Sequence, residues 1–180
     1  IEFFLSNLNV KKIYSFEPNK KTFEQIKKKY LNYNKVLLFN IGLAEKAQTK
    51  ELNIIEDSSS STFNDIDENT NYFERKKNFL SFLSFKKKFV TEKQPINLHT
   101  LSEIIEKYKI EKIDILKIDT EGYEYKILSG INEKYFKNIK YVYFEHHYDL
   151  MLIKNYKFSD INNLLLKNDF KIIFKIKMNF

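Results

Sequence analysis

Cysteine is absent from the 180-residue sequence, which excludes disulfide bonds and cysteine-ligated metal sites. Long apolar runs are absent too. The longest uncharged apolar-rich piece covers only residues 78–85, whereas a membrane-spanning helix needs about 20 residues. We therefore expect no membrane span. The cytoplasm is the default expectation for the location. No targeting peptide is visible, and we expect any such signal on the natural protein to have been lost with its beginning.

Arginine is nearly absent, because Arg75 is the only one in a chain with a formal net charge of +7. Arginine is the residue type best suited to bidentate contacts with phosphates and base edges. A lysine excess without arginine is typical of A/T-rich coding rather than of a nucleic-acid-binding face. We expect no specific nucleic-acid partner, although an RNA-binding protein that uses its lysines stays a third hypothesis.

Apolar segments alternate between strand and helix spacing along most of the chain. This pattern predicts one α/β domain over residues 1–180, with a mainly parallel Rossmann-like sheet and helices on both faces. A polar, lysine-rich insertion at about 57–90 interrupts it. We interpret the insertion as a surface loop, or as a lid or acceptor-binding segment over a site. The expected strands are 11–17, 36–39, 51–56, 89–98, 113–118, 140–145 and 170–177, and the expected helices are 1–9, 20–30, 101–109, 124–128 and 159–167.

Three of the expected strands end in an acidic residue. Glu17, Asp119 and Glu145 each follow a short apolar run. In open α/β sheets, ligands bind just beyond the carboxyl ends of the strands. We therefore expect these acids to lie at one edge of one sheet and to form one site.

The same three places carry a family resemblance. The segments SFEPN at 15–19, LKIDTEGYEYKILSGI at 116–131 and YFEHHYD at 143–149 resemble the FkbM-type methyltransferases in order and spacing. The resemblance implies a Rossmann-like class I methyltransferase fold and S-adenosyl-L-methionine as cofactor. Such enzymes bind the methionine part of the cofactor at a glycine-rich turn after their first strand.

That glycine-rich turn is missing from this sequence. Only three glycines occur, Gly42, Gly122 and Gly130, and none precedes the 11–17 strand. Close approach of backbone to a cofactor usually needs glycine. We interpret the chain as a fragment that lacks the first strand and its loop, and we expect the fragment to bind cofactor poorly.

Four residues are candidates for cofactor binding. Glu17 can accept hydrogen bonds from a ribose diol, the role that the resemblance implies, or it can favour the next helix through its dipole. Asn19 follows in the same turn and can cap that helix. Asn40 comes after the 36–39 strand, where such folds contact adenine. Asp119 is placed to attract a sulfonium charge, or else it or Thr120 caps the helix that follows.

Four residues are candidates for catalysis. Glu145, His146 and His147 end a strand, and one of them can take the proton that an acceptor hydroxyl loses. Alternation along a strand puts the two histidines on opposite faces, so only one is expected in the site. Glu121 shares a face with Asp119 if the strand continues. The alternative is that the histidines are surface residues. We expect no metal site, although Asp119, Glu121 and one histidine are suitable ligand types.

These patterns together predict an S-adenosylmethionine-dependent O-methyltransferase that acts on a hydroxyl of a sugar, glycan or small molecule. The alternative is a noncatalytic Rossmann-like module that uses the acidic edge to bind a nucleotide or sugar. Acids at three strand ends would repel phosphates, which disfavours the RNA hypothesis.

Overall fold

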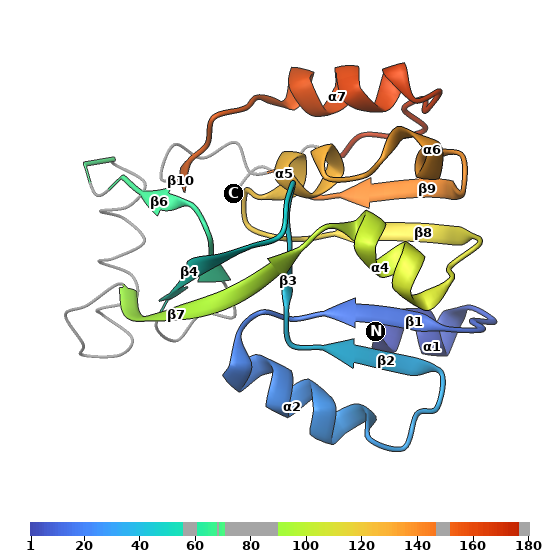
Figure 1. The fold of residues 1–180 in the computed structure, drawn as a ribbon, viewed down its shortest axis with the longest axis horizontal. Helices are drawn as coiled ribbons and strands as arrows, with labels where there is room; N and C mark the ends of the chain where they lie inside the picture. Colours follow the sequence, from blue (N-terminus) through green and yellow to red (C-terminus); the bar gives the residue numbers. More distant parts are fainter. Residues whose placement is uncertain (56–60, 68, 71–89, 147–151, 177–180) are drawn as a thin grey trace.

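The fold is that of a computed structural model, which describes residues 1–55, 61–67, 69–70, 90–146 and 152–176 (Figure 1). Strands and helices alternate over most of this part of the chain. The elements are α1 (Glu2–Asn7), β1 (Ile13–Phe16), α2 (Lys20–Tyr30), β2 (Val36–Phe39), β3 (Gly42–Leu43), β4 (Gln48–Ile55), β5 (Ser61–Thr62), β6 (Asp65–Ile66), β7 (Val90–His99), α4 (Leu101–Tyr108), β8 (Ile113–Ile118), α5 (Glu124–Ser129), α6 (Glu133–Phe136), β9 (Ile139–Phe144), β10 (Leu152–Ile153) and α7 (Phe158–Lys167). The expected mixed α/β class is confirmed.

The four strands that end in or near the predicted site form two parallel pairs. Strand β1 pairs with β2 from Ile13↔Val36 to Phe16↔Phe39. Strand β8 pairs with β9 from Ile113↔Ile139 to Ile118↔Phe144. The four arrows run in the same direction in Figure 1. Within the described ranges, however, hydrogen bonds join these strands only inside each pair. The structure therefore has two separate two-stranded sheets, β1–β2 and β8–β9, where one sheet was expected.

A second sheet has the order β3-β7-β4-β5. Its longest pairing is the antiparallel one of β4 with β7, which runs from Gln48↔Leu98 to Ile55↔Val90. The strands expected at 51–56 and 89–98 are therefore confirmed, and the first is longer than expected. Strands β6 and β10 form a short antiparallel ladder, with Leu152 opposite Ile66, that the sequence did not predict.

Helices α2 and α4 begin at side chains that cap them. At α2, Asn19 Oδ1 accepts hydrogen bonds from the backbone N–H of Lys21 at 3.0 Å and of Thr22 at 3.4 Å. At α4, Thr100 and Glu103 form a reciprocal capping box. Such caps satisfy N–H groups that have no partner inside the helix. Both helices were expected from their apolar spacing, and both are confirmed.

Helix α4 links the two strand pairs through the core. Its apolar stripe of Leu101, Ile104 and Ile105 is buried in the same cluster as residues of β7, β8 and α5. At its last turn, the Tyr108 ring packs edge-on against Tyr14 of β1 and Phe39 of β2, with ring centroids 5.9 and 5.2 Å apart. One helix therefore fixes the pair β1–β2 relative to the centre of the domain.

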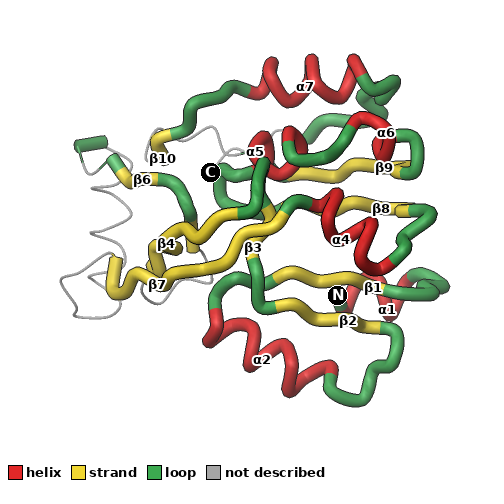
Figure 2. Tube along the Cα trace, viewed as in Figure 1, coloured by secondary structure: helices red, strands yellow, loops and turns green. Residues whose placement is uncertain are grey.

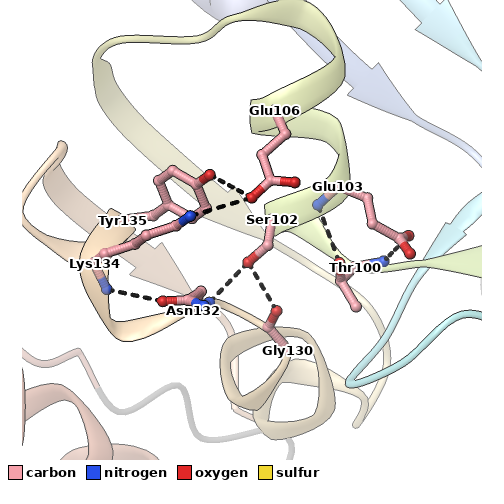
Figure 3. Close-up of polar contacts among 8 residues, drawn as sticks. All are labelled: Thr100, Ser102, Glu103, Glu106, Gly130, Asn132, Lys134 and Tyr135. Atoms are coloured by element: carbon pink, nitrogen blue, oxygen red, sulfur yellow. Dashed lines mark hydrogen bonds and ion pairs between the residues drawn. The ribbon is translucent and has the colours of Figure 1, made fainter.

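A polar junction joins α4 to the segment between α5 and α6 (Figure 3). The Ser102 hydroxyl donates to the carbonyl of Gly130 at 3.1 Å and accepts from the backbone N–H of Asn132 at 2.7 Å. One turn later, Glu106 accepts a 2.6 Å hydrogen bond from the Tyr135 hydroxyl. A side chain at position 130 would approach the Ala44 carbonyl oxygen to 2.2 Å, so only glycine fits there. The junction thus fixes where α5 ends.

Two sequence expectations about strands are wrong. Residues 170–176 form no strand, and Ile172, Ile173 and Phe174 are exposed. The continuous apolar run Val36–Phe39 predicts a fully buried strand, but β2 is only partly buried. An apolar strand is fully buried only when neighbours cover both of its faces and edges, and in the described chain β2 pairs with β1 alone. The pattern of apolar residues was correct, but among the described residues only one strand covers an edge of β2.

Across the described residues, no helix combines the length and the apolar character that crossing a membrane requires.

Candidate functional site

The turns after β1, β2 and β8 leave their strands on the same side (Figure 2). Strand β9 ends there too, because it is parallel to β8 in register. The backbone N–H of Glu145 donates to the carbonyl of Ile118 at 3.2 Å, which places the end of β9 beside the residue before Asp119. The expected meeting of these two acidic strand ends is therefore observed. No described contact joins them to Glu17, so the single-site hypothesis stays a prediction.

Glu17 follows β1 in a partly buried position. Its Oε1 accepts a 2.8 Å hydrogen bond from the backbone N–H of Asn19. Burial raises the pKa of the Glu17 carboxyl above its ordinary value, and the bond from Asn19 offsets only part of that shift. Among the described residues no donor reaches Oε2. A half-buried carboxyl with one oxygen open can accept hydrogen bonds from a ligand.

Asn19 and Asn40 hold the turn that carries Glu17. Asn19 caps α2 through Oδ1, and its amide nitrogen donates to Ser61 Oγ at 3.2 Å. Asn40 donates from Nδ2 to the carbonyls of Glu17 at 2.8 Å and Pro18 at 3.0 Å. Both side chains therefore have structural partners. Their predicted contacts with cofactor remain untested.

The acidic turn after β8 has a different form from the expected one. The strand ends at Ile118, so Asp119 and Glu121 do not share the face of a continuing strand. Asp119 pairs with Lys117 Nζ at 2.6 Å instead of capping α5, whose N-cap residue is Tyr123. Glu121 and Gly122 both have positive φ angles, 49° and 87°. The turn is therefore a tight left-handed exit whose shape decides where the Glu121 side chain lies.

Glu124 is a fully buried acid behind that turn. Its Oε1 accepts hydrogen bonds from the backbone N–H of Gly122 at 2.9 Å and from the Thr120 hydroxyl at 3.2 Å. Its Oε2 accepts a 2.5 Å hydrogen bond from the Tyr156 hydroxyl. Burial and the neighbouring acid raise the pKa of Tyr156 well above its ordinary value, so the hydroxyl stays protonated and keeps donating.

His146 is the histidine candidate that the structure describes, and it follows the end of β9. His146 is partly buried, and its ring lies 5.9 Å from that of Tyr156 and 5.7 Å from that of Phe158, measured between centroids. Glu145 is also partly buried. The apolar run of residues 141–144 predicts a buried strand, but Tyr141 and Tyr143 are 43% and 46% exposed. His147 lies outside the described residues, so the expectation that only one histidine faces the site is untested.

In the parts of the chain that are described, no three histidine, aspartate or glutamate side chains come together as a metal site.

Comparison with known families decides the class of protein. The family model for the methyltransferase FkbM domain matches residues 1–172. The chain belongs to the FkbM methyltransferase family. FkbM methyltransferases use S-adenosylmethionine. Neither the curated proteins nor the solved structures that were searched contain a match to the chain.

In this FkbM domain, sequence reasoning missed Glu124, Tyr156 and the buried polar residues of 61–66. One signal for Glu124 was available. An acid four positions after Thr120 lies one helical turn away and can reach back to the exposed N–H groups of the turn. Tyr156 gave no such signal, because its partner Glu124 is 32 positions away. Asn64 gave none either, because its amide donates to the carbonyls of Glu121 and Gly122, 57 and 58 positions away.

Proposed function

We propose that the chain is part of an S-adenosylmethionine-dependent O-methyltransferase that acts on a hydroxyl of a sugar, glycan or small molecule. The observation that carries the proposal is the acidic turn after β8, held beside the end of β9 in a chain of the FkbM family. A hydroxyl acceptor needs both orientation and a base, and acids at adjoining strand ends can supply both.

The residues around β1 fit the cofactor's nucleoside. Glu17 offers Oε2 toward a ligand, and ribose hydroxyls are donors that a carboxylate binds strongly. Asn40 uses its amide nitrogen to hold the turn, which leaves its carbonyl oxygen for an adenine amino group. Asn19 supports Glu17 through its backbone N–H. Asp119 is the proposed neighbour of the positively charged sulfur.

The proposed chemistry is a methyl transfer with one proton to remove. Bound S-adenosylmethionine supplies an electrophilic methyl group. The acceptor oxygen gains the bond to carbon as the carbon–sulfur bond breaks, and the hydroxyl proton passes to a base at the end of β9. Glu145, His146 and His147 are the candidate bases, and Glu121 orients the hydroxyl. The products are a methyl ether and S-adenosylhomocysteine.

The strand pairing supports a further parallel strand beside β1 and β8. In the described chain β1 pairs only with β2, and β8 pairs only with β9. Each therefore has one edge of backbone N–H and C=O groups that a parallel strand can satisfy. We propose that an upstream strand and glycine-rich turn occupy this place and complete the cofactor pocket. Residues 1–180 alone would then bind cofactor poorly.

Calorimetry on the full-length protein, as its gene encodes it, tests the proposal. We expect it to bind S-adenosylmethionine, and Glu17→Ala to weaken binding by about 1–3 kcal/mol, the usual cost of losing charge-assisted hydrogen bonds. Glu51→Ala is the control, because Glu51 lies on β4, is exposed and pairs with Lys93 of β7. Unchanged affinity in Glu17→Ala would remove Glu17 from the site.

Turnover separates the enzyme from a binding module. S-adenosylhomocysteine release should be measured with sugars and small alcohols as acceptors. Binding of cofactor without release for any hydroxyl acceptor would favour the noncatalytic module instead.

A further inference from the structure

The left-handed turn at Glu121 and Gly122 needs support from elsewhere in the chain. A residue with a side chain rarely adopts a positive φ, because its Cβ crowds the backbone, and Glu121 does so at 49°. Such a conformation persists only where surrounding contacts fix it. The identity of those contacts shows which residues control the direction of the Glu121 side chain.

The support comes from residues 61–66. The Thr62 hydroxyl donates to the Glu121 carbonyl at 3.0 Å. The Asn64 amide nitrogen donates to the carbonyls of Glu121 at 3.3 Å and Gly122 at 2.7 Å. A Cβ at position 122 would lie 2.8 Å from that same amide nitrogen, so the close approach also requires glycine.

These two side chains are themselves fixed. Thr62 and Asn64 are 1% and 8% exposed. Thr62 Oγ1 accepts from the backbone N–H of Asn64 at 3.1 Å, and Asn53 of β4 donates to the Asn64 carbonyl at 3.0 Å. Hydrogen bonds between buried groups are costly to lose, because the partner that remains has no water to replace the lost group. Thr62 and Asn64 are therefore held in place against the Glu121–Gly122 turn.

The same segment also reaches the chain after β9. Strand β6, which directly follows Asn64, pairs with β10. Residues 61–66 thus contact both the acidic turn after β8 and the segment that follows the end of β9. These are the two places that carry the proposed catalytic residues.

From these contacts we infer that Thr62 and Asn64 are positioning residues of the methyl-transfer site, which hold the Glu121–Gly122 backbone so that Glu121 is aimed at the acceptor hydroxyl. The inference rests on the proposed function. It gives the first part of the polar insertion a role different from that of a surface loop or a lid. Thr62 and Asn64 touch the backbone of the turn, so they act through Glu121.

Two conservative substitutions of Thr62 test the inference in the full-length protein. Thr62→Val keeps the shape and removes the hydroxyl, whereas Thr62→Ser keeps the hydroxyl. We expect Thr62→Val to lower kcat by about 10-fold or more with cofactor affinity within about 2-fold of wild type, and Thr62→Ser to restore most of kcat. Asn64→Asp, which removes both donors without changing size, should act in the same direction. Wild-type kcat in Thr62→Val would overturn the inference.

A double-mutant cycle shows whether Thr62 acts through Glu121. Glu121→Gln should lower kcat on its own, and adding Thr62→Val should then lower it little further, because the group being aimed is already lost. Fully additive losses would contradict the positioning role. Ile104→Val, a buried change in α4, controls for general destabilisation and should leave kcat unchanged.

Hydrogen exchange keeps this test separate from the proposed function. If the wild-type protein transfers no methyl group, the proposed function fails, but exchange in a peptide covering 119–124 still reports on the turn. Faster exchange there in Thr62→Val than in Thr62→Ser supports the contact between 61–66 and the turn. Equal exchange in the two variants would overturn it.

Discussion

Tyr156 and Glu124 are joined by a 2.5 Å hydrogen bond across 32 positions of sequence, inside the core. The rings of Tyr156 and Tyr125 also stack at 5.4 Å. The bond holds the chain before α7 against the first turn of α5. Because Glu124 also accepts from the backbone of Gly122, this pair lies directly behind the acidic turn.

Tyr156→Phe should destabilise the protein by about 1–3 kcal/mol, the usual cost of a buried polar group that loses its partner. Urea denaturation followed by circular dichroism measures the change. Tyr135→Phe is the matched control, because the Tyr135 hydroxyl donates to an exposed acid, Glu106. Its loss should cost less than about 1 kcal/mol. Equal effects of the two changes would show that Glu124 is not dependent on Tyr156.

Glu17→Gln should change the pH dependence of stability. Burial raises the folded-state pKa of Glu17 above its ordinary value. The folded state therefore holds the proton more tightly, and stability is lost as pH rises from the ordinary value of 4.5 through the raised one. Glutamine is neutral throughout, so the variant should gain stability relative to wild type over this interval. Denaturation midpoints between pH 4 and pH 7 would reveal the gain, and parallel profiles would contradict it.

Asn19→Ala should destabilise the protein by about 0.5–2 kcal/mol, because α2 loses the acceptor that caps its N-terminus. Asn19→Asp keeps the acceptor oxygen and should recover most of that loss. Thermal melting measures both variants. A smaller loss in Asn19→Ala than in Asn19→Asp would show that the cap contributes nothing.

Gly122→Ala should be more damaging than an ordinary surface change. The residue has a φ of 87°, and a Cβ would meet the Asn64 amide nitrogen at 2.8 Å. The expected loss is about 1–3 kcal/mol of stability, the usual cost of such backbone strain. Ser129→Ala, a change at the exposed last residue of α5, serves as comparison in the same melt. A Gly122→Ala variant as stable as wild type would mean that the turn can adopt another shape.

Local patterns in the sequence predicted the elements well. The apolar spacing of Leu101, Ile104 and Ile105 located α4, and Asn19 marked the start of α2. These features depend on neighbours within one or two turns of helix, which a single sequence displays. The family was also predictable, because its motifs at Glu17 and Asp119 are contiguous.

The contacts that shape the site could not be predicted in this way. Thr62 lies in a polar segment that reads as an ordinary loop, and its partner Glu121 is 59 positions away. Likewise, nothing in the sequence near Ile172 shows that residues 170–176 pair with no strand in the described part of the chain. Burial of such residues depends on segments that are far away in the sequence, and local periodicity does not encode those contacts.

The distance along the chain between the acidic turn and its support also bears on the order of folding. The bonds from Asn64 to Glu121 and Gly122 span 57 and 58 positions, whereas the pair β8–β9 closes over a much shorter loop. Contacts with large sequence separation form late, because the entropy of loop closure must be overcome first. We expect the acidic turn at 119–122 to acquire its native shape later than the strand pair β8–β9. In pulsed hydrogen exchange, amides of 119–124 should then become protected after those of β8 and β9.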